Sequence, residues 1–395
     1  MRALILTEQT SNDRKALGSV RSLAKQGFEV AVACDTRLSS AFWSRYTRQR
    51  LPCPSPISQK NLYIDWLLRS VSEHQPDVLL PVSDYTTLLV SELSAELAPL
   101  IRFAVPPVES FHVAHDKQKL LALAEKLGIP TPLGYCPSSR TELLAIAENL
   151  SYPAVFKLRK GAGAIGLGFP HSPGELLAQY DALGDYGDDI YTAERPLVQE
   201  FVPGPIHDVC ALFEHGEPRA ALTQVRSLMY PPVGGVGIYN QTTEEPQARA
   251  MAIKLLRELN WHGPAMVEFK RDDRDGVFRL IEINPRLWGT LDLSIQAGFD
   301  VPARIAELAV AGSIPTAAGY QVGASYRWPF PYVLKGQLSR RDIWRLVRPQ
   351  AGMHSEFRWS DPMPELAKAM DSGLRAWHRL RARGRGDLEQ KVLDG

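Results

Sequence analysis

The chain has 395 residues, of which 45% are hydrophobic and 23% are charged, a balance typical of a globular protein with two or three packed units. Its formal net charge of +1 leaves no basic excess to neutralise phosphates, so we expect no nucleic-acid partner. Its four cysteines are widely spaced, its start has no apolar signal-peptide run, and no stretch reaches the roughly 20 apolar residues of a membrane span. We therefore expect a cytoplasmic protein without a transmembrane segment.

The first hundred residues predict a small parallel α/β unit. A strand at residues 2–6, a helix that ends near Gly27 and a strand at residues 28–34 imply a right-handed crossover between parallel strands. The next strand, at residues 77–82, ends in polar residues that include Asp84, at the edge where such sheets commonly bind ligands. The alternative is that Asp84 only caps the helix that follows.

A glycine-rich stretch, KLRKGAGAIGLGF at residues 157–169, follows another predicted strand. Gly161, Gly163 and Gly166 spell the G-x-G-x-x-G of dinucleotide-binding folds, but that motif must open a helix at once, and two prolines follow here instead. A Walker loop is also excluded, because no Gly-Lys-Ser/Thr sequence closes the stretch. We predict a strand–loop–strand hairpin whose backbone amides can fold over phosphates, with Lys157 in reach of them. A plain glycine-rich loop is the alternative.

Residues 266–288 predict two strands joined by a tight turn at an Asp-Gly pair. A three-residue loop centred on Asp275 would place Glu268 opposite Glu282, with Asn284 farther along the same face. Facing carboxylates repel each other, and a divalent cation between them would turn that cost into a binding site whose oxygen ligands suit Mg²⁺. An ordinary hairpin with a solvated polar face would show the same pattern.

In their order along the chain, these parts resemble the ATP-grasp superfamily, and more narrowly its carboxylate–amine ligase-like members. The resemblance rests on Asp116-Lys117, Lys157 with the glycine hairpin, residues 199–202, Glu268, and the sequence Glu282-x-Asn284-Pro-Arg286. It covers residues 100–312 well and the preceding residues more loosely. It implies an α/β fold in which an N-terminal Rossmann-like parallel α/β unit is followed by an ATP-grasp domain made of two α+β subdomains.

The same resemblance divides the chain into four parts. Residues 1–112 would form the N-terminal pre-ATP-grasp α/β domain, and residues 113–196 the lid subdomain. Residues 197–325 would form the central subdomain with the metal site, and residues 326–395 a helical extension rich in Arg and Trp. The last helix has a basic end, which is usually a solvated face but is also typical of amphipathic segments that touch a membrane surface.

The resemblance also implies nucleotide-binding roles for individual residues. The two lysines that hold the ATP phosphates are Lys117 and Lys157. The lid that closes over the phosphates contains Gly161, Ala162, Gly163, Ala164 and Gly166. The hinge that pairs with adenine, mostly through backbone groups, consists of Gln199, Glu200, Phe201 and Val202. Many relatives keep an acidic residue just after the hinge for the ribose, and here that contact is left open between His207 and Asp208.

The implied metal ligands are Glu268, Glu282 and Asn284. Arg286 matches the arginine that stabilises the transferred phosphoryl group, and Arg226 with the Gly234-Gly235 loop resembles the segment that faces the acyl substrate. Together with Lys157, these two arginines are the expected catalytic residues. Phosphoryl transfer asks mainly for positioning and charge stabilisation, so lysines, arginines and Mg²⁺ suffice without a nucleophilic Ser or Cys.

The implied function is an ATP-dependent carboxylate–amine ligase that forms an amide or peptide bond through an acylphosphate intermediate and releases ADP and phosphate. Its cofactors would be ATP and Mg²⁺, or Mn²⁺ in its place. Its partners would be small-molecule carboxylates and amines, with a homodimer as one option for its assembly.

Two alternatives stay open beside the ligase. An ATP-dependent carboxylase of the biotin-carboxylase kind would need a carrier lysine, and Lys368 is a poor match to that motif. A non-catalytic nucleotide-binding regulator would be indicated by lost metal ligands, and all three residues of that set are present.

Overall fold

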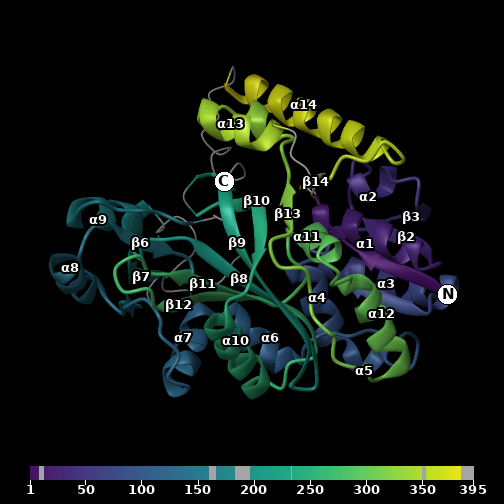
Figure 1. Ribbon diagram of the computed structural model, residues 1–395, viewed down its shortest axis with the longest axis horizontal. Coiled ribbons are helices and arrows are strands. Elements are labelled where there is room, and N and C mark those ends of the chain that lie inside the picture. Colours follow the sequence, from purple (N-terminus) through teal and green to yellow (C-terminus); the bar gives the residue numbers. More distant parts are fainter. Residues whose placement is uncertain (9–12, 160–165, 183–195, 233, 349–352, 384–395) are drawn as a thin grey trace.

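The structure is a computed structural model that describes residues 1–8, 13–159, 166–182, 196–232, 234–348 and 353–383. Within these residues the chain forms three β-sheets with helices packed around them (Figure 1). One sheet is parallel and another is mixed, so the expected α/β class is confirmed. No helix in this part of the chain is long and apolar enough to cross a membrane.

The first sheet has the predicted parallel arrangement. Its strands have the order β3-β2-β1-β4, and every neighbouring pair is parallel. The strands are β1 (Arg2–Leu6), β2 (Glu29–Cys34), β3 (Thr47–Pro52) and β4 (Val78–Pro81). The helices that connect and follow them are α1 (Arg14–Lys25), α2 (Ser40–Trp43), α3 (Lys60–His74), α4 (Asp84–Glu92) and α5 (Ser94–Leu97). Alternate residues of β1 belong to two separate buried clusters, so both faces of the sheet are covered, as parallel sheets require.

The second sheet has the strand order β12-β11-β8-β9-β10-β13-β14 and is antiparallel except for the pair of β13 and β14. Its strands are β8 (Ile206–Glu214), β9 (Glu217–Tyr230), β10 (Val236–Thr243), β11 (Gly263–Arg271), β12 (Phe278–Asn284), β13 (Ser325–Arg327) and β14 (Met353–Ser355). One face packs against α6 (Val108–His115), α7 (Lys117–Lys126) and α10 (Pro246–Glu258). The other face shares a buried cluster with α1, α11 (Leu291–Gln296) and α12 (Val301–Ala311), so this sheet and the parallel unit have a common core.

The third sheet is small and has the order β5-β7-β6. Its strands are β5 (Gly134–Tyr135), β6 (Ala154–Lys157) and β7 (Leu197–Glu200), and α8 (Arg140–Asn149) and α9 (Pro173–Ala182) cover it. Phe156 and Gly168 exchange two backbone hydrogen bonds, with N···O distances of 2.9 and 2.7 Å. The two arms of the predicted glycine hairpin therefore run antiparallel, while its tip, residues 160–165, lies outside the described residues.

The C-terminal part of the chain adds two short helices and one long helix to this core. They are a 3₁₀ helix, η2 (Tyr332–Leu334), and two α-helices, α13 (Arg340–Val347) and α14 (Met363–Arg383). Helix α14 packs against α2, and both C-terminal helices lie at the top of the molecule in Figure 1.

The hairpin of β11 and β12 has the predicted register at its inner end and a different register at its turn. Glu268 pairs with Glu282, as expected. An irregularity just after Glu268 then shifts the pairing by one residue. The predicted three-residue loop is wrong, because the Asp272 amide donates to the Val277 carbonyl at 3.0 Å and closes a longer loop. The bulge absorbs the difference and restores the pair of glutamates.

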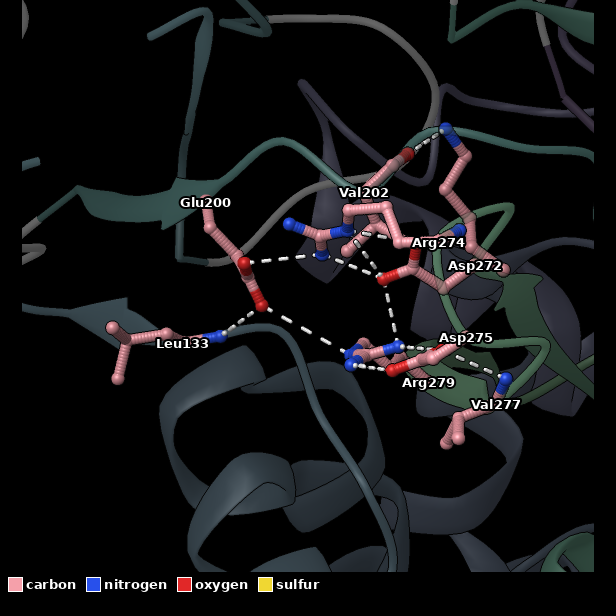
Figure 2. A network of polar contacts seen from close by, with 9 residues as sticks. Leu133, Glu200, Val202, Asp272, Arg274, Asp275, Val277 and Arg279 are labelled. Carbon is pink, nitrogen blue, oxygen red and sulfur yellow. Dashed lines mark hydrogen bonds and ion pairs between the residues drawn. The ribbon is translucent and has the colours of Figure 1, made fainter. Parts of the chain in front are cut away.

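A network of charged side chains fixes this longer loop (Figure 2). The Asp272 carboxylate accepts from the Arg274 backbone amide at 3.0 Å and forms an ion pair with Arg279 at 2.7 Å. Arg279 also pairs with Asp275 at 2.8 Å. Arg274 reaches Glu200 at the end of β7 at 3.2 Å, which ties the turn to the third sheet. Each acid in this turn network is therefore matched by an arginine of the same network.

Candidate active site

Two carboxylates face each other on one side of the second sheet. Glu268 on β11 and Glu282 on β12 occupy paired positions, and the Asn284 side-chain amide donates to both, at 2.9 and 3.4 Å. Burial raises the pKa of Glu268. Burial acts on Glu282 as well, but Lys117 and Lys157 outweigh it and hold the pKa of that carboxyl below its ordinary value. The register therefore brings the three predicted metal ligands together.

Two lysines approach the carboxylates from separate elements. Lys117 is the first residue of α7, and its ammonium lies 3.6 Å from Glu282. The helix begins here because Asp116 accepts from amides of its first turn, and Arg159 holds the Asp116 carboxylate at 2.5 and 2.7 Å. Lys157 ends β6, and burial, together with the charge of Lys117, lowers its pKa to about 8. Both predicted phosphate-binding lysines thus lie within electrostatic reach of the carboxylates.

Arg226 on β9 lies between two buried acids. It forms an ion pair with Asp208 on β8 at 2.7 Å and also contacts Glu268. Strand pairing places Asp208 beside Glu268 on the same face of the sheet. His207 points to the opposite face, because neighbouring residues of a strand alternate, and its Nδ1 lies 3.5 Å from Glu245. Of the two residues considered for the ribose contact, Asp208 therefore shares the carboxylate face and His207 does not.

Arg286 joins the carboxylate hairpin to the parallel unit. Its Nε donates to the Asp84 carboxylate at 2.7 Å, and its Nη2 donates to the Asn284 side-chain oxygen at 2.8 Å. Asp84 begins α4, but that helix is capped by the Ser83 hydroxyl, which accepts from the Thr86 amide at 3.2 Å. Burial would raise the pKa of Asp84, but Arg286 outweighs it and holds that pKa below its ordinary value. The Asp84 carboxylate thus binds Arg286, and the Ser83 hydroxyl caps the helix.

Two charged residues near this contact were not identified from the sequence. Glu8 follows β1 and accepts a hydrogen bond from the Ser83 hydroxyl, and burial raises its pKa to about 7. Lys15 lies in the first turn of α1, and burial, with the nearby charge of Arg286, lowers its pKa. A signal for Glu8 was available, because it sits just past the carboxyl end of a parallel strand, where such sheets bind ligands.

The predicted adenine hinge runs from the end of β7 into the segment before β8. Gln199 is buried, and its side-chain nitrogen has no hydrogen-bond partner among the described residues. The Glu200 carboxylate instead accepts from the Leu133 amide at 3.1 Å and pairs with the arginines of the turn network (Figure 2). The Val202 carbonyl accepts from the Lys270 ammonium at 2.6 Å. Gln199 therefore offers a ligand a buried donor within the hinge.

The glycine hairpin meets the hinge and the loop after β9. Four predicted lid residues lie outside the described residues, namely Gly161, Ala162, Gly163 and Ala164. Gly166 is described and has a left-handed φ of 66°. Phe169, on the returning arm, packs edge-on against Phe201 of the hinge, with 6.2 Å between ring centroids. A side chain at Gly234, whose φ is 72°, would approach Leu167 to 2.5 Å. The returning arm thus contacts both segments that are predicted to face substrates.

The donor set at the paired glutamates fits a divalent cation. Glu268 and Glu282 supply hard oxygen donors from adjacent strands, and Asn284, whose side-chain nitrogen faces both carboxylates, would add its amide oxygen after a flip of the side-chain amide. Mg²⁺ is commonly held by one or two protein carboxylates and completes its octahedron with water and phosphate oxygens. Among the described residues there is no group of three or more His, Cys, Asp and Glu side chains that could hold a metal. Two carboxylates and one amide would leave positions on such a cation for water and phosphate oxygens.

The arrangement of the sheets is that of ATP-grasp proteins of known structure. The chain resembles a biotin carboxylase from Campylobacter jejuni, solved as a complex with beta-gamma-ATP, with a TM-score of 0.66 and 16% identity over 82% of this chain and 74% of that one. It also resembles an L-amino acid ligase from Bacillus licheniformis, with a TM-score of 0.61 and 15% identity over 78% of this chain and 74% of that one. At these identities, the likeness shows the fold alone.

The sequence matches point to the same superfamily. Residues 192–328 match the family model ATPgrasp_Ter, described as ATP-grasp in the biosynthetic pathway with Ter operon. The carbamoyl phosphate synthase large chain of Methanosphaerula palustris is 24% identical over 314 residues, which cover 70% of this chain and 28% of that relative. The chain thus spans less than a third of that relative's length. Together with the fold, these matches confirm the expected resemblance to the ATP-grasp superfamily.

Proposed function

We propose that the chain is an ATP-dependent carboxylate–amine ligase, ADP-forming, that makes an amide or peptide bond through an acylphosphate. The proposal is carried by the convergence of four cations on the pair of Glu268 and Glu282. The four cations are Lys117, Lys157, Arg226 and Arg286. They come from separate elements, and such a set suits a polyphosphate bound with a divalent cation, because the cations match phosphate oxygens and the carboxylates match the metal.

The residues of the site divide between metal and phosphate. Glu268, Glu282 and Asn284 would hold Mg²⁺ or Mn²⁺, which neutralises charge on the phosphates when it is bound. In the structure Lys117 pairs with Glu282 at 3.6 Å. A cation between the glutamates would compete for that carboxylate and leave Lys117 available to the phosphates. The buried Gln199 amide supports an adenine subsite in the hinge, and Asp208 is the better placed of the two residues considered for the ribose.

The chemistry needs a carboxylate oxygen to become a leaving group. Transfer of the γ-phosphoryl group to the substrate carboxylate gives an acylphosphate and ADP. The amine nitrogen then attacks the carbonyl carbon, expels phosphate and loses a proton. In this scheme Lys157 and Arg286 stabilise charge on the transferred group, and Arg226 faces the acyl substrate. Asp84 would be a positioning residue, since it acts on the reaction only through its contact with Arg286 at 2.7 Å.

Carboxylation of the biotin-carboxylase kind is the second candidate, because the fold resembles a biotin carboxylase. A carrier lysine on this chain would need an exposed side chain. Lys368 is buried and lies 2.5 Å from Glu356 and 3.2 Å from Glu365. That burial favours the ligase over a carboxylase that carries its own biotin. The convergence of the expected metal ligands likewise favours a catalyst over a non-catalytic regulator.

We also infer the domain boundaries and the cellular location of the chain. The separate buried cluster of the third sheet supports a lid subdomain over residues 113–196, although β7 of that sheet (Leu197–Glu200) lies past its proposed end, and strands β8 to β12 of the second sheet support a central subdomain over residues 197–325. The extension would begin at residue 326 and the N-terminal domain would end at residue 112. All four cysteines are free thiols, which supports a cytoplasmic location. A homodimer stays one option for the assembly.

An ADP-release screen against paired pools of carboxylic acids and amines tests the proposal. We expect ADP and orthophosphate to appear only when a matching acid is present, and hydroxylamine to trap a hydroxamate from that acid without the amine. AMP and pyrophosphate as products would reject the acylphosphate route. Bicarbonate-dependent turnover without an amine would favour the carboxylase, and ATP binding without cleavage would favour the regulator.

A further inference from the structure

Tryptophans are exposed on the C-terminal extension and buried in the core. Trp261, Trp288 and Trp328 are fully buried. By contrast, Trp344 on α13 is 59% exposed, and Trp359, just before α14, is 88% exposed. Highly exposed tryptophans are unusual, because the indole ring buries a large apolar area when it packs against other side chains or against a binding partner. Their concentration on one part of the chain therefore indicates an interaction surface.

Helix α14 carries an exposed apolar stripe. Met363, Leu366, Met370 and Leu374 are each 43% to 48% exposed. At 100° per residue their spacing keeps them within an arc of about 80° on the helix. Trp377 falls in the same arc and is also exposed. A surface helix normally turns its apolar stripe toward the protein core. Because the stripe of α14 is exposed instead, it is suited to contact an apolar environment outside the protein.

A different side of α14 attaches the helix to the protein. Lys368 is buried and forms ion pairs with Glu356 and Glu365. The segment before the helix is held to the parallel unit, because Arg21 on α1 binds the Asp361 carboxylate at 2.9 Å and the Glu356 carbonyl at 2.9 Å. The helix thus has a separate polar anchor, and its apolar stripe is not needed to keep it on the protein.

Helix α13, which lies with α14 at the top of the molecule in Figure 1, carries positive charge. Trp344 and Val347 are exposed among four exposed arginines, Arg340, Arg341, Arg345 and Arg348. The charge is uneven along the whole chain. Residues 335–395 contain 13 Lys and Arg against 8 Asp and Glu, whereas residues 1–334 contain 32 against 36. The extension is therefore basic on a chain that is otherwise slightly acidic.

We propose that the outer surface of α13 and α14 binds the interface of a lipid bilayer that contains anionic headgroups. Apolar side chains that insert at the acyl boundary, together with arginines that meet negative headgroups, are the two signals that stable peripheral binding requires. The stripe supplies the first signal, and the arginines of α13 supply the second. This proposal is independent of the ligase assignment, since it uses none of the residues of the carboxylate site.

Other occupants match the surface less well. A second copy of the chain, docked about a twofold axis, would bring each arginine-rich surface against itself, and like charges would repel. Nucleic acid would match the arginines but would leave the Met and Leu stripe without a role, because phosphate neutralisation uses no aliphatic side chains. A bilayer interface satisfies both the charge and the stripe.

Co-sedimentation of the full chain with phosphatidylcholine vesicles, with and without phosphatidylglycerol, tests this inference. We expect binding to the anionic vesicles and binding weaker by about tenfold or more without phosphatidylglycerol. Leu366→Ser should weaken binding to anionic vesicles by about tenfold, since it removes an inserting side chain. Leu144→Ser, the same change at a 41% exposed position of α8, should leave binding unchanged. Arg340→Gln with Arg341→Gln should reduce the dependence on phosphatidylglycerol.

Thermal unfolding midpoints of these variants should stay near that of the parent, because the substituted side chains are exposed. Failure of the parent chain to sediment with anionic vesicles would overturn the inference, and so would equal binding by Leu366→Ser and Leu144→Ser. Concentration-dependent dimerisation that Leu366→Ser abolishes would assign the surface to a second copy. Binding of a DNA or RNA oligonucleotide with no vesicle binding would assign it to nucleic acid.

Discussion

The β11–β12 hairpin carries a charge network at each end, and the two networks differ in kind. At the turn, Asp272 and Asp275 are matched by Arg274 of the loop and by Arg279 at the start of β12, with contacts of 2.6 to 2.8 Å (Figure 2). At the inner end, two glutamates face each other across the strands, and the cations that hold them come from other parts of the chain. The turn network is complete in itself, whereas the inner one combines like charges that oppose each other.

Whether the acids in a network are matched by nearby arginines or face each other distinguishes a structural network from a functional one better than the number of charges does. The turn network closes a loop and ties it to β7, and its half-exposed pairs, such as Arg274 with Glu200 and Arg279 with Asp275, contribute little to stability. The inner network forces a buried and a partly buried carboxylate together, which costs stability and is retained where a ligand can use it. The predictions that follow probe the two ends of the hairpin separately, from the largest expected effect to the smallest.

Glu282→Gln should have the largest effect on activity. It removes one charge and little volume from the inner network, so the chain should keep its fold and lose ATP cleavage by about a hundredfold or more. ADP release with a productive acid, beside a thermal unfolding midpoint close to the parent value, checks both parts. Turnover at the parental rate would show that this hairpin is not the metal site.

Arg226→Ala should have the largest effect on stability. Asp208 and Glu268 would both lose a buried cation, and breaking a buried pair costs about 3 kcal/mol or more. Urea unfolding measures the loss as a lower midpoint with an unchanged slope. Arg274→Ala removes the same kind of side chain from the turn network and should shift the midpoint far less. Equal shifts for the two variants would contradict the contrast between the two ends.

Lys157 should give the site a dependence on pH. Its pKa in the folded chain is about 8, against 10.5 for an ordinary lysine, and burial is the main cause. Nucleotide binding should therefore weaken as pH rises through about 8, because the amine loses its charge. The unfolded chain binds the proton more tightly than the folded chain does. The contribution of Lys157 to folding stability should therefore rise as the pH increases from about 8 to 10.5. Lys157→Arg keeps its charge and should flatten the binding profile; an unchanged profile would show that another group titrates.

Asp275→Asn should have the smallest effect. Asp275 is the exposed acid of the turn network, and the backbone contact between Asp272 and Val277 keeps the loop closed without it. ADP release and the unfolding midpoint should both match the parent within error. A loss of activity as large as that of Glu282→Gln would mean that the turn network takes part in the reaction.

Local patterns predicted the parts of the site that lie close together in the sequence. Alternation and the Asp-Gly turn predicted the pair of Glu268 and Glu282, although the predicted loop was too short and a bulge that was not predicted restores the pair. The sequence did not predict that the bulge compensates for the longer loop, because this depends on how Asp272 and Arg279 fill the turn. The parallel sheet followed from runs of apolar residues, but β3, an edge strand with Arg and Gln at exposed positions, has no such pattern.

Long-range contacts of the site could not be predicted in the same way. Arg286 and Asp84 are 202 residues apart, and their contact depends on how the parallel unit docks on the second sheet. The choice between His207 and Asp208 needed the pairing of β8 with β11, which alternation within one strand does not supply. The partners of Arg226 likewise depend on the pairing of β9 with β8 and of β8 with β11, and β11 is distant from the other two strands in the sequence.

Binding of Mn²⁺ in the presence of ADP, followed by electron paramagnetic resonance, tests the central claim most directly. Glu268, Glu282 and Asn284 are proposed to hold the divalent cation that accompanies the nucleotide. The parent chain and Asp275→Asn should bind Mn²⁺ with the same affinity when ADP is present, and Glu282→Gln should bind it at least about tenfold more weakly. Equal affinity in all three proteins would contradict the account and place the metal elsewhere.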